Sequence, residues 1–148
     1  MAGSRLILNS FLATILGVFL IGMAGNAVAG DAKHKLVIQV STDDARTQKI
    51  ALNNAVNLQK MYGMDDVSIE IVAYGPGLGL MTKKSPQADR VKSLAMQNIT
   101  FSACGNTMKK VEKKKGKKPA LTEGVQVVDA GVARIMALQE DGYAYIRP

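Results

Sequence analysis

The sequence predicts an α/β domain of three layers, in which a mainly parallel sheet of about five strands lies between helices. Two observations favour this fold class. Apolar runs rich in Val and Ile alternate along the chain with segments of helical periodicity, and Gly, Pro or Asp marks most of the boundaries. This alternation is typical of parallel strands joined by right-handed helical crossovers, with helices on both faces of the sheet.

The domain begins with a buried strand at Leu36–Ser41. Asp43 or Asp44 then caps a helix, whose apolar residues recur at helical spacing until Gly63 ends it. The second strand is predicted at Val67–Tyr74, where the sequence is VSIEIVAY.

The middle of the domain opens with the glycine-rich segment 75–79, for which a tight turn is predicted. Ser85 and Pro86 are typical of the N-cap and the first residue of a helix, and this helix runs to about Gln97. A short third strand follows at Ile99–Ala103.

In the last part of the chain, Cys104 opens a third helix that ends near Gly116. The remaining elements are a strand at Val125–Asp129, a helix at Val132–Glu140 stopped by Gly142, and a short strand at Tyr143–Ile146. No repeat is evident, so residues 30–148 are predicted to form a single domain.

Residues 1–29 have the layout of a cleavable secretory signal peptide. Arg5 precedes an apolar run over residues 6–23, and Ala27-Val28-Ala29 supplies the small residues of a cleavage site after Ala29. An uncleaved anchor is the alternative, because the run is about long enough to span a bilayer. No other stretch is this apolar, so the mature protein is expected to be periplasmic or secreted, with no stable membrane span.

A strongly basic segment, Lys109–Lys118 (KKVEKKKGKK), contributes most to the formal net charge of +7. Nucleic acid is not the expected partner, because the chain carries an export signal and few aromatic residues to stack on bases. A lysine run at a helix end is typical of a solvated face. Contact with an acidic partner protein or an anionic membrane surface is the functional alternative.

Cys104 is the only cysteine in the sequence and is the predicted catalytic residue. It follows a strand and begins a helix, which is where open α/β sheets bind ligands. A helix N-terminus lowers a thiol pKa from about 8.5, and Lys109 and Lys110 would add to this effect. Cys104 also shares a helical face with Met108 and Val111, so an inert core cysteine remains the second interpretation.

The other polar residues indicate neither a metal site nor a cofactor. His34 stands in a short polar lead without neighbouring ligand residues. The glycine-rich segment lacks the Gly-Lys-Ser/Thr ending of a phosphate loop and does not follow the first strand, as a dinucleotide fingerprint does. Gly75 and Gly77 are instead candidates for the wall of a thiol pocket, provided that the fold places them beside Cys104. No Ser, His and Asp arrangement or carboxylate pair indicates a hydrolase.

Four stretches of the sequence resemble the DsrE/DsrF-like family of small sulfur-relay proteins: LVIQVSTDD, VAYGPGLGL, ITFSACGNTMKKV and VDAGVARIMALQEDGYAYIRP. The last two are most similar to an exported branch of that family. The resemblance implies a DsrE-like, flavodoxin-like architecture and assembly into a homotrimer or homohexamer. It also implies that Cys104 accepts sulfur as a persulfide. In that role, we expect Asn106 and the backbone around Gly105 to support the anion. The sulfur donor and acceptor proteins are not implied.

We therefore expect a periplasmic sulfur carrier or sulfurtransferase-like protein that forms a persulfide on Cys104. The alternative is a non-catalytic, oligomeric binding module of the same fold. In that case Cys104 is structural, and the glycine-rich segment holds a small anionic ligand. Fold analogy does not decide between turnover and binding.

Overall fold

The computed structural model describes residues 32–148, so the predicted signal peptide and its cleavage site lie outside the described residues. The strands are β1 (His34–Val40), β2 (Val67–Ala73), β3 (Ile99–Cys104), β4 (Val125–Val128) and β5 (Ala144–Ile146). The helices are α1 (Ala45–Tyr62), the 3₁₀ helix η1 (Gly75–Met81), α2 (Ala88–Ala95), α3 (Gly105–Lys115) and α4 (Gly131–Glu140). Over residues 32–148, no helix has the length and apolar character that a membrane crossing requires.

The sheet has five strands in the order β4-β3-β2-β1-β5, and every neighbouring pair is parallel. This confirms the predicted fold class. Because all strands run the same way, the segments that follow β2, β3 and β4 emerge at one edge of the sheet, its carboxyl edge. The residues immediately after these strands are thereby brought together.

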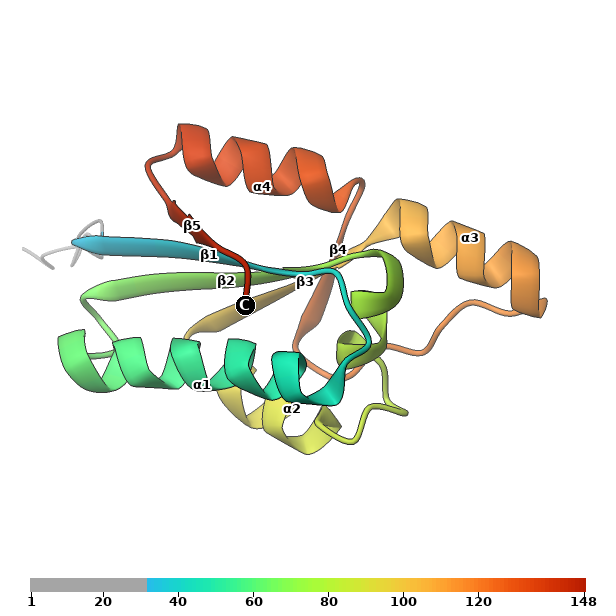
Figure 1. Ribbon diagram of the computed structural model, residues 1–148, viewed down its shortest axis with the longest axis horizontal. Coiled ribbons are helices and arrows are strands. Elements are labelled where there is room, and N and C mark those ends of the chain that lie inside the picture. The colour runs from blue at the N-terminus through green and yellow to red at the C-terminus, as the bar shows by residue number, and fades with distance from the viewer. Residues whose placement is uncertain (1–31) are drawn as a thin grey trace, which may run out of the picture. The chain divides into compact units, whose positions relative to one another are not determined.

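Helices cover both faces of the sheet, as Figure 1 shows, with α1 and α2 below it and α4 above it. From β1 to β4, each connection leads to the next strand in the same direction across the sheet. The connection from β4 to β5, which contains α4, crosses in the reverse direction to the opposite edge. A right-handed crossover in the reverse direction places its helix on the other face. This is why α4 lies opposite α1 and α2.

The core has two parts, one on each face of the sheet. The larger part lies against α1, α2 and η1, and its fully buried members include Ile38, Leu52, Ile71, Leu80 and Phe101. The smaller part lies under α4 and consists of Val37, Val72, Ile135 and Leu138. Strand residues alternate between the two faces, so the near-continuous apolar runs of β1 and β2 supply both parts.

Helix α1 begins and ends as the sequence predicts. Asp44 is its N-cap, and the Asp44 carboxylate accepts a hydrogen bond of 2.7 Å from the Thr47 N–H. Gly63 follows the last helical residue with a φ of 90°, which favours glycine. Helix α3 likewise ends at Gly116, which is left-handed.

Three local predictions are wrong. His34 does not stand in a polar lead but is the first residue of β1. The glycine-rich segment is not a tight turn but continues as the 3₁₀ helix η1, which buries Leu78, Leu80 and Met81. Helix α2 begins at Ala88 rather than Pro86, because Ser85 forms a turn of its own before the helix. In that turn, the Ser85 hydroxyl accepts from the N–H of Gln87 and the Ser85 carbonyl accepts from that of Ala88.

Candidate functional site: a thiol at two helix N-termini

Cys104 is the last residue of β3 and the N-cap of α3. Its backbone is still extended, with a φ of −70° and a ψ of 116°, so the side chain lies where the strand becomes a helix. The residue is 5% exposed. On the carboxyl edge of the sheet, its neighbours are the segment after β2 on one side and the segment after β4 on the other. The prediction that Cys104 lies at a strand-to-helix junction is confirmed.

The surroundings of the Cys104 sulfur lower its pKa. Burial is the largest single influence and raises the pKa, but four hydrogen-bond interactions oppose it and outweigh it together. They come from the hydroxyl of Thr107 and from the backbone N–H groups of Gly131, Thr107 and Asn106. The N–H groups belong to the first turns of two helices, α3 and α4, so both helix N-termini favour the thiolate.

Thr107 connects the thiol to the glycine-rich segment. It lies three residues after Cys104, so one turn of α3 brings its hydroxyl back toward the sulfur. The Thr107 oxygen also accepts a hydrogen bond of 3.0 Å from the N–H of Gly75. The Thr107 hydroxyl therefore accepts from the Gly75 N–H and also lowers the pKa of the Cys104 thiol.

Gly131 and Gly105 let backbone segments approach the thiol closely. A Cβ atom on Gly131 would lie 3.0 Å from the Tyr74 ring and 3.3 Å from Cβ of Cys104. A Cβ atom on Gly105 would lie 3.1 Å from the carbonyl oxygen of Val128. At both positions a side chain would push the beginning of a helix away from its neighbours.

The sequence-predicted site residues therefore divide in two. Gly75 and Gly105 lie next to the thiol region, and Asn106 contributes its backbone N–H, which also donates to the Asp129 carbonyl at 3.1 Å. Gly77 instead packs against the end of β1, where an added Cβ would lie 2.1 Å from the carbonyl oxygen of Val40. The lysines at 109 and 110 are not among the principal groups that lower the pKa of Cys104.

A buried polar network lies beneath α4, and no sequence motif pointed to it. Glu70 is in the middle of β2 and 3% exposed, and its carboxylate accepts from Arg134 Nε at 2.9 Å and from Arg134 Nη2 at 2.6 Å. Ser102 donates to the same carboxylate at 2.6 Å, and Gln126 donates to Ser102 at 2.9 Å. A two-point contact of this kind fixes α4, and hence the N–H of Gly131, relative to the sheet.

A cavity of about 500 Å³ lies beside the thiol region but does not include Cys104. Its walls are η1, the outer part of α3 and the segment between α3 and β4. A second, smaller hollow of about 200 Å³ is lined mainly by α3, from Gly105 on, together with Val127 of β4 and Asp129 directly after it. Among residues 32–148, no group of three or more His, Cys, Asp or Glu side chains is arranged to hold a metal ion.

Comparisons with known proteins agree with this architecture. The sequence profile of the DsrE/DsrF-like family matches residues 34–148. The solved structure of MTH1491 from Methanobacterium thermoautotrophicum, described as a protein of unknown function, is similar, with 33% sequence identity and a TM-score of 0.70. The similarity covers 78% of this chain and 99% of MTH1491. No protein with a curated description matches the sequence.

Proposed function

The chain belongs to the DsrE/DsrF-like family, and from this membership we propose that it is a sulfur carrier, or a sulfurtransferase-like protein, that forms a persulfide on Cys104. Family membership suggests a function related to sulfur relay. The environment of the only cysteine is the observation that carries the finer proposal. Four hydrogen-bond interactions lower the pKa of Cys104, and a thiolate, not a thiol, is the nucleophile in sulfur transfer.

The proposed step moves one sulfur atom without a net change in electrons. The thiolate of Cys104 attacks the outer sulfur of a donor persulfide, R–S–SH, and forms a new S–S bond. The S–S bond of the donor breaks, and the donor leaves as the thiolate R–S⁻. Cys104 then carries –S–SH, and the proton stays on the transferred sulfur. Donation to an acceptor thiolate is the same exchange in reverse.

Intact mass measurement after incubation with glutathione persulfide tests this proposal. We expect the wild-type protein to gain one sulfur atom and to lose it on treatment with dithiothreitol. The variant Cys104→Ser should gain none. If the native protein takes up no sulfur and Cys104 is alkylated only after denaturation, the thiol is structural. The non-catalytic binding module would then be the better description of this chain.

We further propose that the protein assembles as a homotrimer or homohexamer. The apolar strand β2 (Val67–Ala73) is covered within the chain and gives no reason for assembly. The support comes instead from Val132 and Met136 on the outer face of α4, which are 68% and 62% exposed, and from Val127 on β4, which is 51% exposed. Light scattering should give a trimer or hexamer mass, and Met136→Lys should reduce it. A monomer mass for the wild type at micromolar concentration contradicts this proposal.

Export to the periplasm or the exterior is the last part of the proposed function. It depends on the sequence of residues 1–29, which has the charged start, apolar run and Ala-Val-Ala site of a signal peptide. N-terminal sequencing of the mature protein should begin at Gly30. If Met1 is found intact in the membrane fraction, the segment is an anchor instead.

A further inference from the structure

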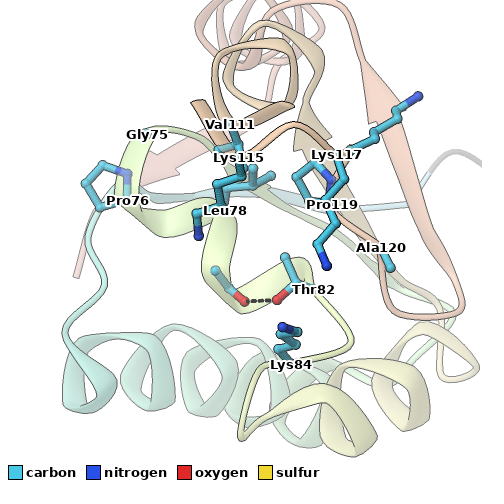
Figure 2. A pocket seen from close by; sticks show the side chains of 12 residues that line it. Gly75, Pro76, Leu78, Thr82, Lys84, Val111, Lys115, Lys117, Pro119 and Ala120 are labelled. Atoms are coloured by element: carbon cyan, nitrogen blue, oxygen red, sulfur yellow. Dashed lines mark hydrogen bonds between the residues drawn. The ribbon is translucent and has the colours of Figure 1, made fainter. Parts of the chain in front are cut away.

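The cavity beside the thiol has the size of a small-molecule site. Its volume is about 500 Å³, and ligand pockets range from about 300 to 1,000 Å³. Figure 2 shows Leu78, Val111 and Lys115 on one side of it, with Thr82 and Lys84 opposite. Pro119 and Ala120 complete the wall. Cys104 does not line the cavity, so a ligand there is not bound to the thiol.

The wall of this cavity combines an apolar surface with positive charge. The apolar lining residues are Pro76, Leu78, Val111, Pro119 and Ala120. The charged lining residues are all lysines, namely Lys84, Lys115, Lys117 and Lys118, and no Asp or Glu lines the cavity. Within the part of the chain that the structure describes, none of these lysines forms an ion pair. Their ammonium groups can therefore form ion pairs with a bound anion.

The backbone of the glycine-rich segment is less suited to hold an anion than the sequence suggests. The N–H of Gly75 donates to Thr107 at 3.0 Å, and the N–H of Gly77 donates to the Tyr74 carbonyl at 3.1 Å. Two of the N–H groups that would make an anion nest are thus already engaged. Positive charge at this cavity comes from lysine side chains, which accept many anion geometries rather than one.

We propose that this cavity binds a small amphipathic organic anion, with its hydrocarbon body against Leu78 and Val111 and its carboxylate, sulfonate or phosphate head at the lysines. A purely inorganic anion leaves the apolar wall uncovered, and a neutral apolar molecule leaves the lysines unpaired. The basic segment Lys109–Lys118, in the second half of α3 and directly after it, thereby has a role besides solvation. The proposed binding does not depend on sulfur transfer. Cys104 does not line the cavity, and neither does Thr107, whose hydroxyl lowers the pKa of the thiol.

Isothermal titration with octanoate tests this inference on the mature protein, with matched compounds as controls. Octanamide has the same body without charge, and acetate has the head group without the body. We expect saturable binding of one octanoate per chain, and binding of both controls at least about tenfold weaker. Equal binding of octanoate and octanamide, or of octanoate and acetate, overturns the proposal.

Paired lysine substitutions show whether the cavity itself is the site. The double variant Lys84→Gln and Lys115→Gln removes two charges from the wall of the cavity. The double variant Lys113→Gln and Lys114→Gln removes two charges from the neighbouring part of α3, which does not line the cavity. The first pair should weaken octanoate binding about tenfold, since each exposed ion pair contributes up to about fivefold. The second pair should change it less than twofold. Equal losses in both pairs mean non-specific attraction and contradict the proposal.

A variant that fills the cavity and one that removes the thiol complete the test. Gly79 lines the cavity, and an added Cβ there would meet no atom within 4 Å, so Gly79→Leu should fold and abolish octanoate binding. Cys104→Ser should retain binding, which separates this result from any failure of sulfur transfer. Vesicles of phosphatidylglycerol and of phosphatidylcholine form the last arm. Binding to anionic vesicles without binding to octanoate means that the lysines adhere to membranes, and the proposal is then wrong.

Discussion

Replacing Thr107 by Val removes a hydroxyl that lowers the pKa of Cys104, at almost constant side-chain volume. A hydrogen bond to a charged group contributes about 1.5–3 kcal/mol, and we take the lower end because sulfur is a weak acceptor. A free-energy difference of about 1.4 kcal/mol is a tenfold change in the ionisation equilibrium. At pH values below the pKa of both proteins, Thr107→Val should therefore carry about tenfold less thiolate than the wild type.

The expected change in rate is smaller than the change in ionisation, because a more basic thiolate is a better nucleophile. With a Brønsted coefficient of about 0.4–0.5, a tenfold change in ionisation makes each thiolate about threefold more reactive. In that pH range, alkylation of the variant by iodoacetamide should thus be about three- to fourfold slower than alkylation of the wild type. At pH values where both proteins are fully ionised, the variant should be faster. This crossing of the two rate–pH curves is the signature of a lost hydrogen bond.

Thr107→Ser is the matched control, because it keeps the hydroxyl that donates to Cys104 and accepts from Gly75. Its rate–pH curve should follow the wild type, with a midpoint below that of Cys104 in the urea-denatured chain. Because the pKa of Cys104 is lowered in the folded protein, its ionisation stabilises the fold above the pKa of the unfolded thiol. That stabilisation is lost as the pH falls through the folded pKa. Coincident curves for Thr107→Val and the wild type, or a variant slower at every pH, would refute this reasoning.

Four further variants test the packing around the site by chemical denaturation. Gly77→Ala should cost at least about 2 kcal/mol, because its Cβ would lie 2.1 Å from the carbonyl oxygen of Val40, whereas Gly79→Ala, in open space, should stay within about 0.5 kcal/mol. Arg134→Met leaves the Glu70 side chain, 4% exposed, with Ser102 as a donor but without its cationic partner. We expect a loss of about 2 kcal/mol, below the usual 3–5 for a buried pair because Arg134 is 36% exposed. A loss under 0.5 kcal/mol would show that the pair does not hold α4. Gln at positions 113–115 should cost less than about 1 kcal/mol, and a larger loss would mean that these exposed lysines are packed or paired.

Strands and most helix ends were predictable because their causes are local. An apolar β-branched run such as VIQV or VSIEIV has few alternatives to a buried strand, and Asp44 and Gly63 act on the residues next to them. The 3₁₀ helix was missed because its cause is distant in sequence. It lies where Gly77 meets the backbone of β1, and a single segment of sequence does not contain that contact.

The same distinction applies to the candidate site. Cys104 was predictable from its place between a strand and a helix. Thr107 was available at helical spacing from Cys104, but its second contact, with Gly75, requires β2 and β3 to be neighbours. Gly131 reaches the thiol because β4 lies at the edge and α4 crosses back over the sheet, and sequence alone did not give the strand order. Glu70 inside an apolar strand was the one available signal for the buried ion pair.

The burial of Cys104 also determines which oxidation products the protein avoids. A chain with a single cysteine can dimerise covalently under oxidising conditions. A disulfide between two copies, however, requires their Cα atoms to approach within about 7 Å. Cys104 is 5% exposed and enclosed by the starts of α3 and α4. Two such sites do not approach that closely unless these helices move apart. The enclosure therefore protects the thiol from a disulfide with a second copy of the chain.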